Sequence, residues 1–147
     1  MITNAQHKPV CEGCNASWDI LELDERGLCL CCVAEHKFKV DLEALRDKRG
    51  AFSVKLKTAG NPDFGQDPRR SLPGVPVMKL RVGSLLNASK ACRLYIAHYE
   101  VGGGAWVGGE VTDVKTKQAV AFISYNGRAW REQYSIKNPI TLEGFVP

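Results

Sequence analysis

Five of the six cysteines in this 147-residue chain lie close together near its beginning. Cys11 and Cys14 form one pair with two residues between them, and Cys29 and Cys32 form a second pair with the same spacing. Two thiolate pairs with this spacing are typical of a tetrahedral zinc site. We therefore expect these four cysteines to hold one Zn²⁺ ion.

A zinc ion with four protein ligands has no open position for water or substrate, so this zinc would be structural and not catalytic. The alternative is a set of reduced, unliganded cysteines in a small core. Cys31 is an alternative ligand to Cys29 or Cys32. His36 is another alternative ligand, although a position on the surface of a helix also accounts for it.

Three local elements would bring the two cysteine pairs together. Cys11 and Cys14 lie in a Gly-containing knuckle, residues 18–27 read as a short hairpin, and residues 33–49 have helical apolar spacing. A knuckle, a hairpin and a cysteine pair at a helix start resemble a treble-clef zinc finger over residues 9–49. The resemblance implies a zinc module at residues 1–50. Because treble clefs serve DNA binding, ubiquitin transfer, nuclease catalysis and protein docking, it does not decide the function.

The remaining residues, 51–147, are expected to form a mostly antiparallel β domain. Alternating or apolar runs predict strands at 52–57, 77–82, 93–101, 105–114, 118–125, 128–135 and 140–146. Asn126 and Gly127 predict a hairpin with a type I′ turn, and a short helix is expected at 84–91. A Pro/Gly-rich stretch at 59–76 predicts an irregular, mobile loop. The predicted fold class is α+β, with a zinc module followed by an antiparallel barrel or sandwich.

The stretch from Ala105 to Phe122 resembles the first strands of a small SH3-like or Tudor-like barrel. It contains an early tryptophan and glycines inside predicted strands. Four aromatic residues in this part of the chain are candidates for a recognition surface or for the core: Trp106, Tyr125, Trp130 and Tyr134.

Positive charge gathers in the middle of the chain. Residues 51–93 carry 8 Lys or Arg and 2 Asp, whereas residues 1–50 carry 7 Lys or Arg and 9 Asp or Glu. Alternation along the two predicted strands places Lys55 with Lys57, and Lys79 with Arg81, on one face each. If the strands pair, the four cations form one stripe, which Arg69 and Arg70 on the loop would extend. Such a stripe is typical of phosphate-backbone binding.

Two other interpretations of the stripe remain open. The cations would also suit solvent-facing strand positions that protect a sheet edge. Alternatively, they would dock the acidic zinc module of the same or a neighbouring subunit.

The sequence contains no recognisable catalytic motif, phosphate-binding loop or evident small-molecule site. No run approaches the length of a membrane span or resembles a signal peptide, so we expect a cytoplasmic protein without membrane contact. The leading hypothesis is a non-enzymatic zinc protein that binds nucleic acid or a transcription complex through its basic β surface. The alternative is a protein-interaction or assembly component, such as a small viral structural or host-takeover protein.

Overall fold

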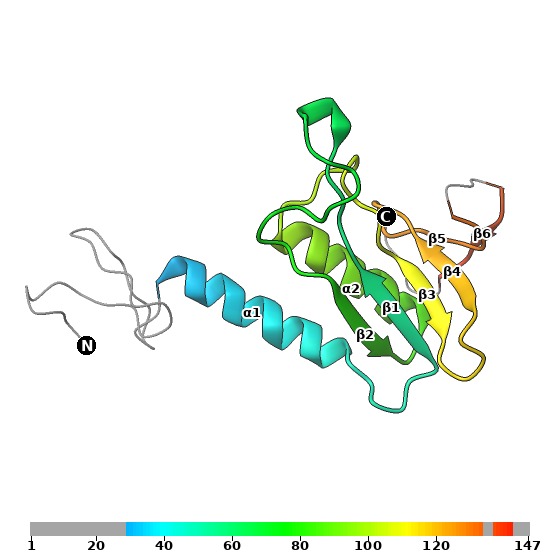
Figure 1. Cartoon of the computed structure of the whole chain (residues 1–147). Helices are drawn as coiled ribbons and strands as arrows, with labels where there is room; N and C mark the ends of the chain where they lie inside the picture. The colour runs from blue at the N-terminus through cyan, green and yellow to red at the C-terminus, as the bar shows by residue number, and fades with distance from the viewer. Residues whose placement is uncertain (1–28, 134–136, 143–147) are drawn as a thin grey trace, which may run out of the picture. The chain divides into compact units, whose positions relative to one another are not determined.

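The computed structural model of the chain describes residues 29–133 and 137–142 (Figure 1). The chain divides between Asp41 and Leu42 into two units. Helix α1 (Leu30–Leu45) crosses this division. The predicted knuckle at Cys11 and Cys14 and the predicted hairpin at 18–27 lie outside the described residues.

The second unit contains one antiparallel sheet and the helix α2 (Leu85–His98). The strands are β1 (Phe52–Leu56), β2 (Met78–Val82), β3 (Glu110–Asp113), β4 (Ala119–Ile123), β5 (Ala129–Trp130) and β6 (Pro139–Ile140). Their order is β2-β1-β3-β4-β5-β6, and every neighbouring pair is antiparallel. The α+β class is confirmed. The described strands form a single sheet in linear order, which differs from the expected barrel or sandwich.

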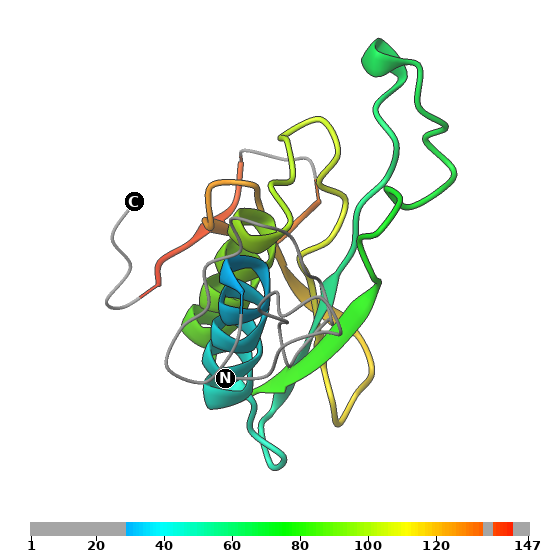
Figure 2. The ribbon, with the colours of Figure 1, turned by 90° about the vertical axis from the view of Figure 1, so that its left-hand side faces the viewer.

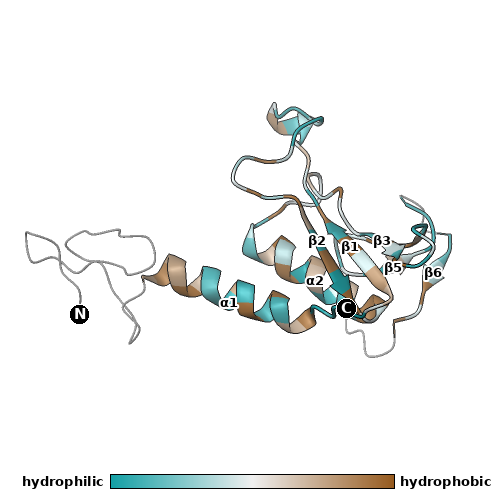
Figure 3. Cartoon of the chain, turned by 60° about the horizontal axis from the view of Figure 1, so that its bottom comes forward, coloured by the Kyte–Doolittle hydropathy of each residue, from teal (hydrophilic) through white to brown (hydrophobic). Residues whose placement is uncertain are grey.

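One face of the sheet forms the core. Strand residues alternate between the two faces, and those on one face are all buried: Val54, Leu56, Leu80, Val82, Val111, Ala121, Ile123 and Ala129. Helix α2 packs against this face, over β1, β2 and β4 (Figure 2). The alternation of apolar and polar residues along β1 and β2 can be followed in Figure 3. The opposite face of the sheet is therefore available for polar and functional side chains.

Helix α2 replaces the strand that the sequence predicts at 93–101. The Ser84 side chain accepts a hydrogen bond from the backbone N–H of Asn87 and caps the helix start. From there, Ala88, Cys92 and Tyr95 repeat at helical spacing and are fully buried. The predicted short helix at 84–91 thus continues to His98, because its apolar stripe continues against the sheet.

The hairpin at Asn126 and Gly127 is confirmed, but its turn type differs from the expected type I′. Type I′ requires positive φ at both central residues, and among the described non-glycine residues only Glu100 and Lys117 have positive φ. Gly127 has φ +84°, and its N–H donates to the Ser124 carbonyl (2.9 Å). The turn is therefore a three-residue loop closed by a glycine in the left-handed region.

The stretch at 59–76 is irregular, as predicted, and projects from the sheet (Figures 1 and 2). Its tip carries a short 3₁₀ turn, Pro62–Phe64, capped by the Asn61 side chain. The base of the loop is held by the Leu72 N–H, which donates to Thr58 Oγ1 (3.1 Å). Among the described residues, no helix has the length and apolar character that crossing a membrane requires.

Candidate functional site

The sheet face opposite α2 carries the basic residues predicted from the sequence. Lys55 in β1 lies directly opposite Lys79 in β2, and Ser53 lies opposite Arg81. Because Val54 and Leu80 between them point into the core, these four side chains share the outer face. The predicted stripe is therefore real at Lys55, Lys79 and Arg81.

These three cations border a shallow hollow of about 510 Å³, which Glu110, Asp113 and Lys117 also line. Within the described residues, neither Lys55 nor Lys79 has an ion-pair partner. Arg81 donates from Nε to the Gly50 carbonyl (2.8 Å), which orients the guanidinium without neutralising it. Asp113 accepts from the Lys115 N–H (2.8 Å) in the following turn. The side chains that line the hollow thus carry a net positive charge.

The other predicted basic residues lie in different places. Lys57 follows β1 on the same face and is half-buried, and its carbonyl accepts from the Val107 N–H (3.4 Å). Arg69 and Arg70 lie on the projecting loop, where both face Asp67 at 3.2 and 3.8 Å. Lys57 thus lies at the end of the predicted stripe, and neither Lys57 nor Arg69 and Arg70 lines the hollow.

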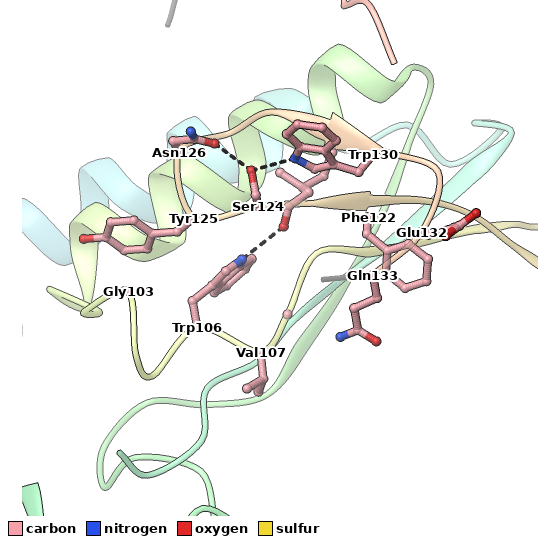
Figure 4. A pocket seen from close by; sticks show the side chains of 12 residues that line it. Gly103, Trp106, Val107, Phe122, Ser124, Tyr125, Asn126, Trp130, Glu132 and Gln133 are labelled. Carbon is pink, nitrogen blue, oxygen red and sulfur yellow. Dashed lines mark hydrogen bonds between the residues drawn. The ribbon is translucent and has the colours of Figure 1, made fainter. Parts of the chain in front are cut away.

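A second hollow, also of about 510 Å³, lies next to the basic one and is lined by aromatic rings. Trp106, Phe122 and Trp130 surround it, with Tyr125 on the adjoining hairpin (Figure 4). Its volume falls within the range of roughly 300–1,000 Å³ that is usual for ligand pockets. Its wall is therefore suited to flat, apolar groups.

The aromatic residues of this hollow differ in their burial and in their hydrogen bonds. Trp106 is buried and donates from its indole N–H to the Ile123 carbonyl (3.1 Å), so most of its ring belongs to the core. Trp130 is half-buried and donates to Ser124 Oγ (3.2 Å). Phe122 is also half-buried, and Tyr125 is exposed. Tyr134 lies outside the described residues.

The two hollows are joined by a row of side chains across the outer face. Lys79 lies opposite Lys55, Glu110 lies opposite Phe122, and Phe122 lies opposite Trp130. The β1–β3 pairing ends at Val54 and Val111, and just beyond it the Gly109 N–H donates to the Lys55 carbonyl (2.7 Å). Lys55 and Glu110 both line the basic hollow, which places Glu110 next in the row. Neighbouring strands lie about 4.8 Å apart, so the four steps of this row cover roughly 19 Å.

Sequence reasoning missed Phe122 as a surface residue. The residue sits in the apolar run Ala119–Ile123, where neither neighbour is polar, so alternation gives no indication of its face. Only the pairing of Val111 with Ala121 shows that Ala121 points inward and Phe122 outward.

The described half of the expected zinc site lies at the start of α1. Cys29 is 3 % exposed, and its carbonyl accepts from the Val33 N–H (2.9 Å), so the second cysteine pair does begin a helix. Cys32 is half-buried, whereas Cys31 and His36 are exposed. The described residues hold no group of three or more metal-ligating side chains, and Cys11 and Cys14 lie outside them.

The remaining cysteine, Cys92, belongs to the core. It is fully buried in α2, and burial raises the pKa of its thiol well above the ordinary value. The thiol therefore stays protonated and behaves as a small apolar side chain.

Comparison of the chain with protein-family models, with curated proteins and with solved structures found no match.

Proposed function

We propose that this protein binds nucleic acid through the outer face of its sheet, as a non-enzymatic binding protein. Lys55, Lys79 and Arg81 would contact phosphates. The N-terminal region would hold one structural Zn²⁺ through Cys11, Cys14, Cys29 and Cys32, and would orient the sheet or dock a protein. A transcription complex is one setting in which such a protein would act.

The observation that supports this proposal is the direct pairing of Lys55 with Lys79 on a face that the core helix leaves open. Like charges directly opposite each other in a sheet are destabilising. Neither lysine has an ion-pair partner among the described residues. An anionic partner would relieve this repulsion, and a polyphosphate backbone is the anion that a stripe of cations fits best.

The test is a titration of the full chain with a fluorescent nucleic acid at two salt concentrations. Phosphate contacts release counterions, so the affinity should fall steeply as salt rises. Lys79→Glu should weaken binding about equally for all sequences and reduce the salt slope by about 1 or more.

The matched control is Lys90→Glu, which makes the same charge change on the exposed side of α2. It should leave both the affinity and the salt slope close to those of the parent. Equal losses in the two variants would mean that only net charge matters, and the outer face would then not be the binding surface.

A second candidate function, protein docking or assembly, is favoured by Phe64. This side chain is 79 % exposed at the tip of the projecting loop, where the Asn61 cap holds the turn. An exposed aromatic residue on an ordered tip fits a pocket on another protein. If this function is correct, the chain should form a stable complex or oligomer that Phe64→Ser weakens, and that moderate salt leaves intact.

A further inference from the structure

We infer that the ligand of the outer face is a single-stranded nucleic acid, with one unpaired base stacked in the hollow formed by Phe122 and Trp130. This inference rests on the proposed function and names its ligand class. The phosphates would lie over Lys79, Lys55 and Arg81, and the strand would run across the sheet toward β5.

The juxtaposition of the two hollows supports this choice. A single strand offers phosphates and free base faces side by side, and its proteins combine a positive groove with aromatic stacking platforms. In a duplex, the bases are stacked on each other and hidden from a sheet of side chains. The aromatic half of the row would therefore have no role in binding a duplex, whereas a single strand uses both halves.

Glu110 separates the two halves of the row. It lies between Lys55 and Phe122 on the outer face, and it has no ion pair among the described residues. A carboxylate repels phosphate, so the backbone would be held on the β1–β2 side and kept away from the aromatic rings. This arrangement favours a base, and not a phosphate, above Phe122.

Hydrogen bonds within the hairpin and to α2 hold the residues of the aromatic hollow in position. Trp130 donates to Ser124 Oγ, which lies 2.6 Å from Asn126 Oδ1. The hairpin carrying these residues is held to α2, because Ser89 Oγ donates to the Gly127 carbonyl (2.6 Å). A second bond joins Arg93 to the Tyr125 carbonyl (2.8 Å). A pre-ordered platform loses little conformational freedom when a base stacks on it.

Polar groups at the rim of the hollow are suited to the edge of a base. Glu132 and Gln133 both line it, and both are exposed (Figure 4). A carboxylate accepts from an exocyclic base amine, and an amide both donates and accepts. The site thus offers stacking on its wall and hydrogen bonding at its rim.

The test uses the unaltered full chain and three fluorescent probes of equal length: oligothymidylate, an abasic oligomer with the same phosphates, and a duplex. At low salt, oligothymidylate should bind about 5- to 100-fold more tightly than the abasic oligomer, which is the effect of stacking about one base. The two single strands should share one salt slope, because their phosphates are the same.

Variants then locate the base. Phe122→Leu keeps the apolar volume and removes the aromatic face, so it should lower the oligothymidylate affinity about fivefold or more and leave the salt slope unchanged. Phe122→Tyr should restore most of the affinity. Phe52→Leu makes the same change in β1, at a side chain that lines neither hollow, and should leave the affinity and the salt slope unchanged.

The outcomes separate the two proposals. Equal affinity for the abasic oligomer and oligothymidylate, or a duplex bound as tightly as the single strand, would overturn the stacking inference. If Lys79→Glu still reduced the salt slope in that case, the proposed nucleic-acid function would remain. No binding to any probe at low salt would overturn both.

Discussion

Lys55 and Lys79 are direct cross-strand partners on the outer face of the sheet. The protein therefore carries a like-charge pair where an opposite-charge or β-branched pair would stabilise the β1–β2 ladder. Sites that are kept for function often sacrifice stability in this way. The pair thus links the stability of the sheet edge to the proposed binding of an anion.

Lys79→Glu should make the protein more stable and a weaker binder. The new carboxylate would face Lys55, and replacing a like-charge pair by an opposite-charge pair is worth about 0.2–1 kcal/mol in a sheet. Urea denaturation measures this gain in the free energy of unfolding. The double variant Lys55→Glu/Lys79→Glu restores a like-charge pair and should lose the gain. A stability loss in the single variant would show that the repulsion is already screened.

Zinc content tests the expected four-cysteine site. Cys14→Ser and Cys29→Ser should each release the metal, because a structural tetrahedral site with a missing ligand loses most of its affinity. Cys31→Ser and Cys92→Ala should each retain one zinc per chain by elemental analysis. Full zinc retention in Cys14→Ser or Cys29→Ser would contradict the ligand set. Loss of zinc in Cys31→Ser alone would assign Cys31 in place of a neighbour.

Local patterns were sufficient for the basic half of the outer face. Residues 52–57 and 78–82 alternate strictly between apolar and polar residues, so the sequence itself assigns Lys55, Lys79 and Arg81 to one face. The structure adds only the pairing of these two strands and the register of that pairing. A short strand with one buried face specifies its register strongly, which is why this part was predictable.

Two features depended on long-range contacts and were not predictable in the same way. Tyr95 and Ile96 favour strands by propensity, yet they belong to α2 because the sheet buries the helical stripe that they complete. Phe122 faces outward because its neighbour Ala121 pairs with the buried Val111, whereas Phe122 itself pairs with Glu110. Neither the helix docking nor this strand pairing has a local sequence signal, so the outward position of Phe122 was not predictable.

Gly109→Ala should strongly destabilise the sheet. Gly109 has φ +90°, and a Cβ there would lie 2.1 Å from the Ile123 carbonyl oxygen. Backbone strain and the forced separation of β3 from β4 should together cost about 3 kcal/mol or more. Thermal denaturation measures the loss. Gly102→Ala is the control, because a Cβ at Gly102 meets nothing within 4 Å and should change the stability little.

Tyr95 should make the stability of the protein depend on pH above neutrality. Its side chain is fully buried in α2, and its hydroxyl donates to the Pro76 carbonyl (2.6 Å). Burial, with a smaller contribution from Tyr99, raises the pKa of the phenol from 10.0 to about 12. The folded-state pKa thus exceeds the unfolded one, so the folded chain holds this proton more tightly.

A group of this kind contributes its full stability below the unfolded pKa, and the contribution is lost as the pH rises through the folded pKa. The free energy of unfolding should therefore fall by on the order of 2 kcal/mol between pH 10 and pH 12 because of Tyr95. Cys92, whose thiol pKa is also raised by burial, adds a loss in the same direction. A Cys92→Ala background removes that contribution and isolates the tyrosine.

In this background, Tyr95→Phe should cost about 1 kcal/mol at pH 7, because the Pro76 carbonyl loses its donor. Above pH 10 the difference in the free energy of unfolding should shrink and then change sign by about pH 12, since only the protein with Tyr95 has a buried phenol to ionise. Urea denaturation at intervals between pH 7 and pH 12 measures both effects. A constant difference between the two proteins over this range would mean that the Tyr95 phenol titrates alike in the folded and unfolded chains, contrary to its burial against Trp106 and the sheet.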